Sequence, residues 1–228
     1  MTKKVLPKAV LLICCTIPTL ALARSETKLD TDKAKYSYTI GVQFAQQIKQ
    51  QNIDLDIDAT VQALKDILSG KDSKLSDEQM NAAMLSLQEL QQKVTAAIAE
   101  KNKKEGEAFL AENKKKKGIK TLDNGIQYKI ITTGKGKKPK ATDTVVVHYR
   151  GTLIDGTEFD SSYSRGQPAE FPVNRVIKGW QEVLPLMPTG SKWKVFIPSD
   201  LAYGSRGTRG PIGPNATLVF DIELLEIK

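Results

Sequence analysis

The sequence predicts an α+β protein in which an all-α arm with a long connecting helix precedes an antiparallel β-sheet wrapped on one short helix. Apolar residues recur every three or four positions up to about residue 98 of the 228-residue chain, which is the period of an amphipathic helix. After Gly118 the pattern changes to the two-residue alternation of strands. We therefore expect a helical arm over residues 24–113 and a sheet domain over residues 114–228, whose residues 114–140 form a lysine-rich linker and first strand.

The first helix is expected from Asp32 to Gln51. One side of it carries an apolar stripe, which consists of Tyr36, Ile40, Phe44 and Ile48. A stripe of small residues lies beside it and consists of Ser37, Gly41 and Ala45. Small residues at helical spacing allow a second helix to approach closely. That second helix could belong to a partner subunit or to the same chain.

Two further helices follow. Asp56 can cap the second helix and Gly70 can end it. Ser76 and Gln79 form a capping box for the third helix. This helix can continue to Glu112, because residues 77–112 contain no proline and only one glycine, Gly106.

The third helix is expected to be packed in its first half and solvated in its second. Its apolar stripe ends at Ile98, and residues 101–105 are polar on every side. A helix over residues 77–112 would be about 54 Å long at 1.5 Å per residue. Three such helices have more apolar surface than they can bury alone, which predicts a homodimer through residues 24–98.

The sheet domain is expected to contain four clear strands and one short helix. The strands are Ile126–Ile130, Thr144–Leu153, Ser191–Ile197 and Leu218–Ile227, and the helix spans about Lys178–Leu184. Asp155-Gly156 marks a turn, and the glycines and prolines between Pro198 and Thr217 indicate a long ordered loop.

The N-terminal residues 1–23 have the pattern of a signal peptide. Three lysines precede an apolar run from Ala9 to Leu22, and Ala21-Leu22-Ala23 supplies small residues for cleavage near Ala23. The mature chain would then lack Cys14 and Cys15 and would act in the periplasm or at the outer membrane and cell surface. Lipidation at Cys15 is the competing interpretation, although the preceding residues fit a lipid-anchor site poorly.

The net charge of +8 does not indicate a nucleic-acid partner. Residues 114–140 hold ten lysines against one aspartate, whereas residues 141–228 hold nine basic and ten acidic groups. The clustered lysines lack the interleaved aromatic residues that stack on bases. A solvated segment explains them better than a polyanion site.

The aromatic residues of the last third predict an apolar binding pocket that holds one carboxylate, Asp160. His148 is the only histidine of the chain and lies inside a predicted strand, and the mature chain would have no cysteine. A serine triad and a histidine or thiolate metal site are therefore excluded, and we expect neither a metal nor a cofactor.

Several motifs together resemble the FKBP-type peptidyl-prolyl isomerases over about residues 120–228. They are Val147-His148-Tyr149-x-Gly151, Asp155-Gly156-x-x-Phe159-Asp160-Ser161-Ser162, Val176-Ile177-x-Gly179-Trp180, Ala202-Tyr203-Gly204 and Ala216-Thr217-Leu218-Val219-Phe220-Asp221. With the leader and the helical arm, the chain is similar to the macrophage infectivity potentiator group, the dimeric envelope isomerases of Gram-negative bacteria. That resemblance implies prolyl isomerisation and a link to virulence.

The resemblance also implies the roles of individual residues. Asp160, Tyr203 and the backbone amide of Ile177 would be the catalytic polar groups, and Arg165 would orient Asp160. The substrate-binding residues would be Tyr149, Phe159, Arg165, Val176, Trp180, Ala202 and Phe220, with Trp180 at the floor. Ala169 and Thr208 depart from the family, where an aromatic wall residue and a histidine are common, which implies a narrower aromatic surface.

The implied partners are proline-containing polypeptides, with rapamycin-type macrolides as inhibitors. Two other functions fit the same sequence. One is a holdase chaperone whose paired arms hold unfolded proteins, with isomerisation secondary. The other is a surface adhesin that uses the clustered lysines.

Overall fold

The computed structural model describes residues 27–51, 53–208 and 210–228. The chain divides into two compact units, Met1–Ile53 and Asp54–Lys228. The predicted leader, with both cysteines, lies outside the described residues. Within the described ranges every helix is too short or too polar to cross a membrane.

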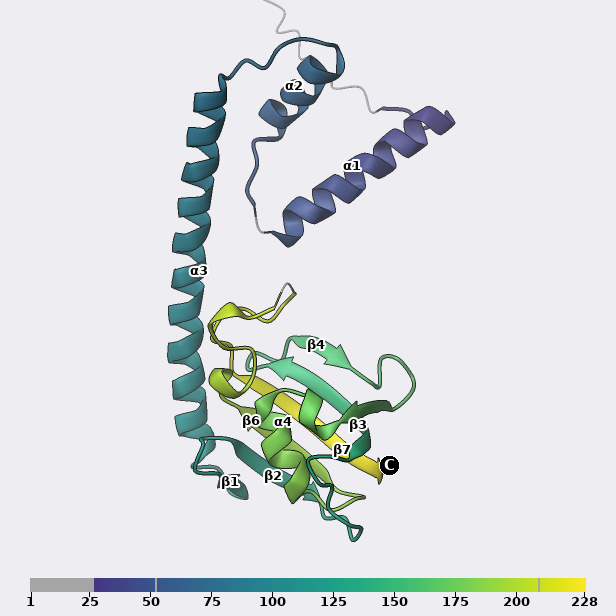
Figure 1. Ribbon diagram of the computed structural model, residues 1–228, viewed down its shortest axis with the longest axis vertical. Helices are drawn as coiled ribbons and strands as arrows, with labels where there is room; N and C mark the ends of the chain where they lie inside the picture. The colour runs from purple at the N-terminus through teal and green to yellow at the C-terminus, as the bar shows by residue number, and fades with distance from the viewer. Residues whose placement is uncertain (1–26, 52, 209) are drawn as a thin grey trace, which may run out of the picture. The chain divides into compact units, whose positions relative to one another are not determined.

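The first unit contains one long helix, α1 (Asp32–Gln50), as the apolar stripe predicted (Figure 1). Thr31 caps it, because its Oγ1 accepts a hydrogen bond of 3.1 Å from the backbone N–H of Ala34. Three of the four apolar side chains of its predicted stripe, Tyr36, Ile40 and Phe44, are exposed in the single chain.

The second unit opens with two helices that begin where the sequence predicted. Asp56 caps α2 (Ile57–Leu68) by accepting a 2.9 Å hydrogen bond from Ala59 N–H. Ser76 and Gln79 cap α3 (Asp77–Asn113) reciprocally. Ser76 N–H donates to Oε1 of Gln79 over 2.9 Å, and Gln79 N–H donates to Oγ of Ser76 over 3.2 Å. At 1.5 Å per residue this 37-residue helix is about 55 Å long.

The expectation that the second half of α3 is solvated is wrong, whereas packing of the first half against a partner subunit stays a prediction. The first half carries exposed apolar side chains, such as Met84, Leu90 and Val94. The second half lies against the sheet domain, where Phe109 contacts Phe196 at a ring separation of 5.8 Å. The contact face of this half combines the aromatic ring of Phe109 with the small residue Gly106 and the polar residue Asn113, so it has no continuous apolar stripe.

That contact face depends on Asn113 and Gly106. Asn113 is buried and donates from Nδ2 to Oε1 of Gln127 over 2.9 Å, and Gln127 Nε2 donates to the carbonyl of Leu110 over 2.8 Å. Gly106 is buried against Thr217, whose Oγ1 would lie only 2.4 Å from a Cβ at position 106. Glycine therefore permits the close approach of helix and domain.

The sheet is antiparallel throughout, with strand order β1-β2-β6-β7-β3-β4 and β5 paired with β3 (Figure 1). The strands are β1 (Ile119–Thr121), β2 (Gln127–Thr132), β3 (Thr144–Leu153), β4 (Glu158–Ser161), β5 (Ala169–Pro172), β6 (Lys192–Ile197) and β7 (Leu218–Ile227). The bounds of β3 and β7 agree with the sequence, whereas the short strands β1, β4 and β5 were not predicted.

The short helix α4 (Lys178–Val183) packs on one face of the sheet. Burial alternates along β3, where Val145, Val147 and Tyr149 are buried on that face. Val183 and Leu184 are fully buried in the same core cluster. This confirms the predicted α+β architecture of a sheet wrapped on one helix.

The clustered lysines are exposed, as expected of a solvated segment, but they belong to folded structure. Lys114–Lys117 form the turn between α3 and β1, and Lys116 lies 5.7 Å from the ring of Phe109. The same segment contains β1 and β2, of which β2 pairs with β6. Residues 114–140 thus join α3 to the sheet through ordered strands.

Candidate active site

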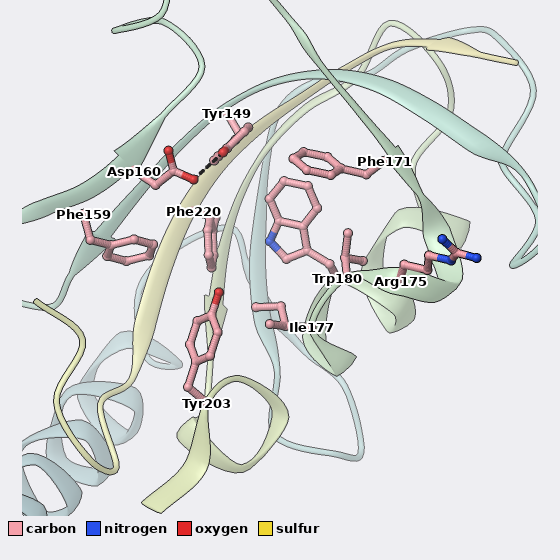
Figure 2. A pocket seen from close by; sticks show the side chains of 10 residues that line it. Tyr149, Phe159, Asp160, Phe171, Arg175, Ile177, Trp180, Tyr203 and Phe220 are labelled. Atoms are coloured by element: carbon pink, nitrogen blue, oxygen red, sulfur yellow. Dashed lines mark hydrogen bonds between the residues drawn. The ribbon is translucent and has the colours of Figure 1, made fainter. Parts of the chain in front are cut away.

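A cavity of about 350 Å³ opens between the sheet and α4. Ten residues line it: Tyr149, Phe159, Asp160, Phe171, Arg175, Val176, Ile177, Trp180, Tyr203 and Phe220 (Figure 2). Eight of these were candidates from the sequence. The ten residues come from β3, β4, β5, β7, α4, the segment between β5 and α4, and the loop after β6, so the tertiary fold brings together segments up to 71 positions apart.

Trp180 lies at the centre of the aromatic walls. Its ring meets those of Tyr149, Phe171 and Phe220 edge to face, at centroid separations of 5.4, 5.9 and 5.3 Å. Such arrangements bring the positive edge of one ring to the negative face of another. The indole is buried on α4, and its Nε1 has no hydrogen-bond partner in the described structure.

Gly151 on β3 makes room for two of these rings. A Cβ at this position would lie 2.6 Å from the Phe159 ring and 2.9 Å from the Phe220 ring. Gly151 pairs in register with Asp160 on β4 and with Phe220 on β7. The absence of a side chain therefore lets Phe159 and Phe220 pack edge to face, 5.6 Å apart.

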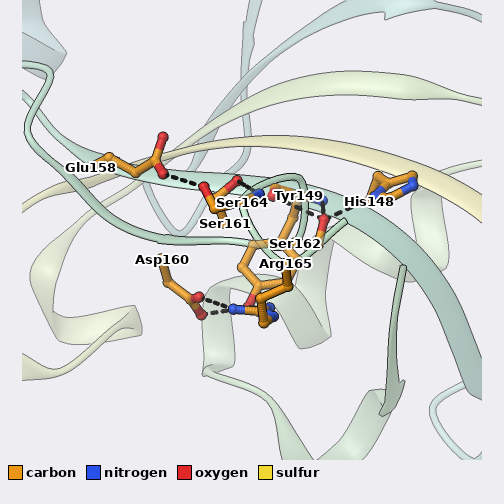
Figure 3. A network of polar contacts seen from close by, with 8 residues as sticks. All are labelled: His148, Tyr149, Glu158, Asp160, Ser161, Ser162, Ser164 and Arg165. Carbon is orange, nitrogen blue, oxygen red and sulfur yellow. Dashed lines mark hydrogen bonds and ion pairs between the residues drawn. The ribbon is translucent and has the colours of Figure 1, made fainter. Parts of the chain in front are cut away.

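The carboxylate of Asp160 is held at the edge of the hollow by two donors (Figures 2 and 3). The Tyr149 hydroxyl and the Arg165 guanidinium both donate to it, and Arg165 Nη2 donates to the Tyr149 oxygen over 2.8 Å. Burial raises the pKa of Asp160, but the bonds from Tyr149 and Arg165 outweigh it, so the pKa is lower than usual. The group is therefore a carboxylate at neutral pH.

Tyr203 supplies the other polar group, and its hydroxyl points into the same hollow (Figure 2). It lies between two short 3-10 helices, η3 (Ser199–Leu201) and η4 (Gly204–Arg206), and is 41% exposed at the cavity mouth. Burial, and then the negative charge of Asp160, raise the pKa of its phenol. Tyr203 therefore keeps its proton and remains a hydrogen-bond donor up to high pH.

Ile177 precedes the first turn of α4 with an extended backbone. Its N–H is among those that a helix leaves without an intrahelical acceptor. The side chains of Val176 and Ile177 form the apolar wall beside Trp180.

Two candidates from the sequence do not line the cavity. Arg165 contacts Asp160 and Tyr149 from outside, with its guanidinium 5.5 Å from the Tyr149 ring. Ala202 is half-buried and packs against the hydrophobic core instead. Its neighbour Tyr203 lines the cavity instead.

Phe171 and Arg175 were missed by sequence reasoning. Phe171 lies two residues after Ala169 in β5, and alternate residues of a strand share a face. Phe171 thus adds an aromatic side chain to the cavity wall from the strand that contains Ala169, whereas the narrower aromatic surface at Ala169 itself stays a prediction. The alternation in β5 was the available signal, but four residues are too few to establish a strand.

His148 lies outside the cavity lining and contacts the segment that directly follows β4, the strand of Asp160 (Figure 3). Its Nδ1 is 3.0 Å from Oγ of the buried Ser162, which also accepts a 2.8 Å hydrogen bond from Tyr149 N–H. Its ring stacks on Tyr163 at 4.7 Å. These contacts give His148 a hydrogen-bonded structural role.

Comparison with known proteins identifies the family. Residues 135–225 match the profile described as FKBP-type peptidyl-prolyl cis-trans isomerase, and residues 33–130 match the domain amino terminal to it. The outer membrane protein MIP of Legionella longbeachae is 49% identical over 92% of both chains. The FKBP-type 22 kDa peptidyl-prolyl cis-trans isomerase of Escherichia coli is 46% identical over 87% of this chain and 97% of its own.

Solved structures agree with the sequence comparisons. The crystal structure of FkpA from Escherichia coli superposes with a TM-score of 0.65 at 39% identity, covering 87% of this chain and 98% of that chain. A peptidyl-prolyl cis-trans isomerase from Pseudomonas syringae superposes with a TM-score of 0.54 at 44% identity, over 57% and 96% of the two chains. The protein therefore belongs to the FKBP-type peptidyl-prolyl cis-trans isomerases.

Proposed function

We propose that this enzyme isomerises X-Pro bonds in proteins of the bacterial cell envelope by binding the prolyl ring in the aromatic cavity. The observation that carries the proposal is the pairing of a ring-lined hollow with two polar groups, the carboxylate of Asp160 and the phenol of Tyr203. The signal-like N-terminal sequence and the description of the Legionella relative as an outer membrane protein support the envelope location.

The chemistry requires only a change of environment. The barrier to rotation about a peptide bond is about 18–20 kcal/mol, because the planar amide is stabilised by resonance. A dry pocket disfavours the polar planar form, and groups fitted to the twisted amide bind the transition state preferentially. An acceleration of about 10⁴ needs about 5.5 kcal/mol, without a nucleophile, a metal or a cofactor.

The polar groups would act at the reacting amide. Tyr203 would donate a hydrogen bond to the substrate carbonyl as it rotates, and the Ile177 amide would fix the substrate backbone. Asp160, held by Tyr149 and Arg165, would stabilise the charge distribution of the twisted state. Trp180 would form the floor beneath the prolyl ring. Rapamycin-type macrolides would compete for the same hollow.

The pH dependence of activity follows from these groups. The pKa of Asp160 is lowered and that of Tyr203 is raised, so neither changes charge near neutrality. Asp160 stays ionised above its unfolded pKa, and its stabilising bonds are lost only as pH falls through its lower folded pKa. We expect kcat/KM to be constant from about pH 5 to 9. A titration near pH 6.5 in a pH-rate profile would contradict this assignment.

The exposed apolar faces of the helices support a homodimer. Ile40 and Phe44 on α1, Leu64 on α2, and Met84 and Val94 on α3 are all exposed in the single chain. Apolar faces of this extent, which a monomer would leave in water, favour association of two copies. Dimerisation through residues 24–98 is therefore part of the proposal.

Charge substitutions on α3 test the dimer. Val94→Glu places a carboxylate in the apolar stripe and is expected to shift the protein from twice the monomer mass to the monomer in sedimentation at micromolar concentration. Ala96→Glu makes the same change on the opposite side of the helix and should leave the dimer intact. A monomeric wild-type chain, or equal effects of both variants, would contradict the assignment.

The second candidate function is a holdase chaperone, which the same exposed faces favour. Tyr203→Phe separates the two functions when isomerisation of a prolyl tetrapeptide and suppression of aggregation are measured on one preparation. Loss of only the isomerisation would show that both activities exist. A wild-type chain that prevents aggregation but isomerises no prolyl peptide would reject the isomerase proposal in favour of the holdase.

A further inference from the structure

The position of Tyr203 depends on a loop rather than on the sheet. The other cavity walls come from strands or from the segment of α4, whereas Tyr203 lies in the connection between β6 and β7. Apart from two single turns, η3 and η4, the described part of this connection has no regular structure. What holds the loop therefore determines where the phenol points.

Two side-chain amides join this loop to α3, which passes beside it in Figure 1. Asn102 on α3 donates from Nδ2 to the carbonyl of Pro214 over 2.8 Å. In return, Asn215 donates from Nδ2 to the carbonyl of Ala99 over 3.3 Å. The residues of each pair are more than a hundred positions apart, so the tertiary fold alone creates this clamp between Asn102 and Asn215.

The clamp continues towards the cavity through the backbone of Asn215. Its N–H donates to the carbonyl of Gly204 over 2.9 Å, and Gly204 directly follows Tyr203. Asn215 has a φ of 54°, and among described residues other than glycine it alone has a positive φ. This conformation is uncommon for residues other than glycine, although asparagine tolerates it better than most. Contacts on both sides thus fix Asn215 between α3 and the turn of Tyr203.

We propose that Asn102 is a positioning residue for isomerisation, acting on Tyr203 through Pro214, Asn215 and Gly204. The second half of α3 then belongs to the catalytic unit and serves as more than a connector to the helical arm. The inference rests on the proposed role of Tyr203. It predicts that removing the Asn102 amide loosens the phenol and impairs isomerisation only while the phenol is present.

A double-mutant cycle in the full chain tests this coupling. The four proteins are the wild type, Asn102→Ala, Tyr203→Phe and the double variant, with kcat and KM measured on a short prolyl peptide. We expect Asn102→Ala to lower kcat about fivefold with little change in KM. In the Tyr203→Phe background the same substitution should change kcat by less than twofold.

Two further variants separate positioning from general destabilisation. Lys104→Ala alters an exposed α3 side chain that pairs with Glu100 at 3.1 Å, and it should retain wild-type kcat. Asn215→Gly preserves the left-handed backbone and the N–H to Gly204 but removes the amide that reaches Ala99. It should repeat the Asn102→Ala result, including its dependence on Tyr203.

The possible failures are distinguishable. If the wild type does not isomerise prolyl peptides, the proposed function itself is overturned. If the wild type is active and Tyr203→Phe impairs it, but Asn102→Ala has no effect or the same effect in both backgrounds, only the positioning role is overturned.

Discussion

Replacing Asp160 by asparagine is expected to lower kcat/KM for a short prolyl peptide about 30-fold, equivalent to about 2 kcal/mol of transition-state stabilisation. Asparagine has nearly the same shape but no charge. Tyr149 and Arg165 hold the native carboxylate at the cavity edge, so the loss would come from its electrostatic effect on the twisted amide. Peptide isomerisation under first-order conditions measures the ratio directly.

Asp221→Asn is the matched control for this charge. Asp221 is a partly exposed aspartate on β7 that pairs with Lys194 at 3.5 Å and is absent from the cavity lining. The control should change kcat/KM by less than twofold. An Asp160→Asn enzyme with wild-type activity would show that the carboxylate has no part in the reaction.

Replacing Trp180 by alanine is expected to lower the free energy of unfolding by about 3–5 kcal/mol and to abolish binding of prolyl substrates. The buried indole packs against Tyr149, Phe171 and Phe220, so its loss removes both core contacts and the cavity floor. Because Nε1 of Trp180 has no partner among the residues that the structure describes, the substitution leaves none of their acceptors unpaired. Urea denaturation gives the stability, and titration with a macrolide gives the binding.

Trp193→Ala separates the two effects of that substitution. Trp193 on β6 is as buried as Trp180, its Nε1 also has no partner in the described structure, and it stacks on Tyr128 at 4.5 Å outside the cavity. We expect a comparable loss of stability with binding retained at temperatures where the variant is folded. Equal loss of binding in both variants would mean that Trp180 acts only through stability.

Long elements with a clear period could be predicted from the sequence. The capping residues Asp56 and Ser76 marked helix starts, and ten-residue alternation gave the bounds of β3 and β7. The cavity residues were identified because the motifs occur together. Each residue alone would fit an ordinary core or surface position.

Features created by long-range contacts could not be predicted. Phe171 belongs to a four-residue strand whose pairing with β3 is visible only in three dimensions. The docking face of α3 contains Asn102, Gly106 and Asn113, which give no hydrophobic period because they act through hydrogen bonds and close approach. The contact between α3 and the sheet domain therefore could not be recognised from the sequence of the helix.

The most direct test of the cavity as the site of catalysis is to measure isomerisation of a prolyl tetrapeptide by the full chain while rapamycin is titrated. The proposal predicts a clear acceleration over the uncatalysed rate that falls to zero as one macrolide binds per chain. It also predicts that Trp180→Ala shows neither the acceleration nor the binding. An acceleration that persists when rapamycin is bound, or a wild-type chain that does not accelerate the reaction, would contradict it.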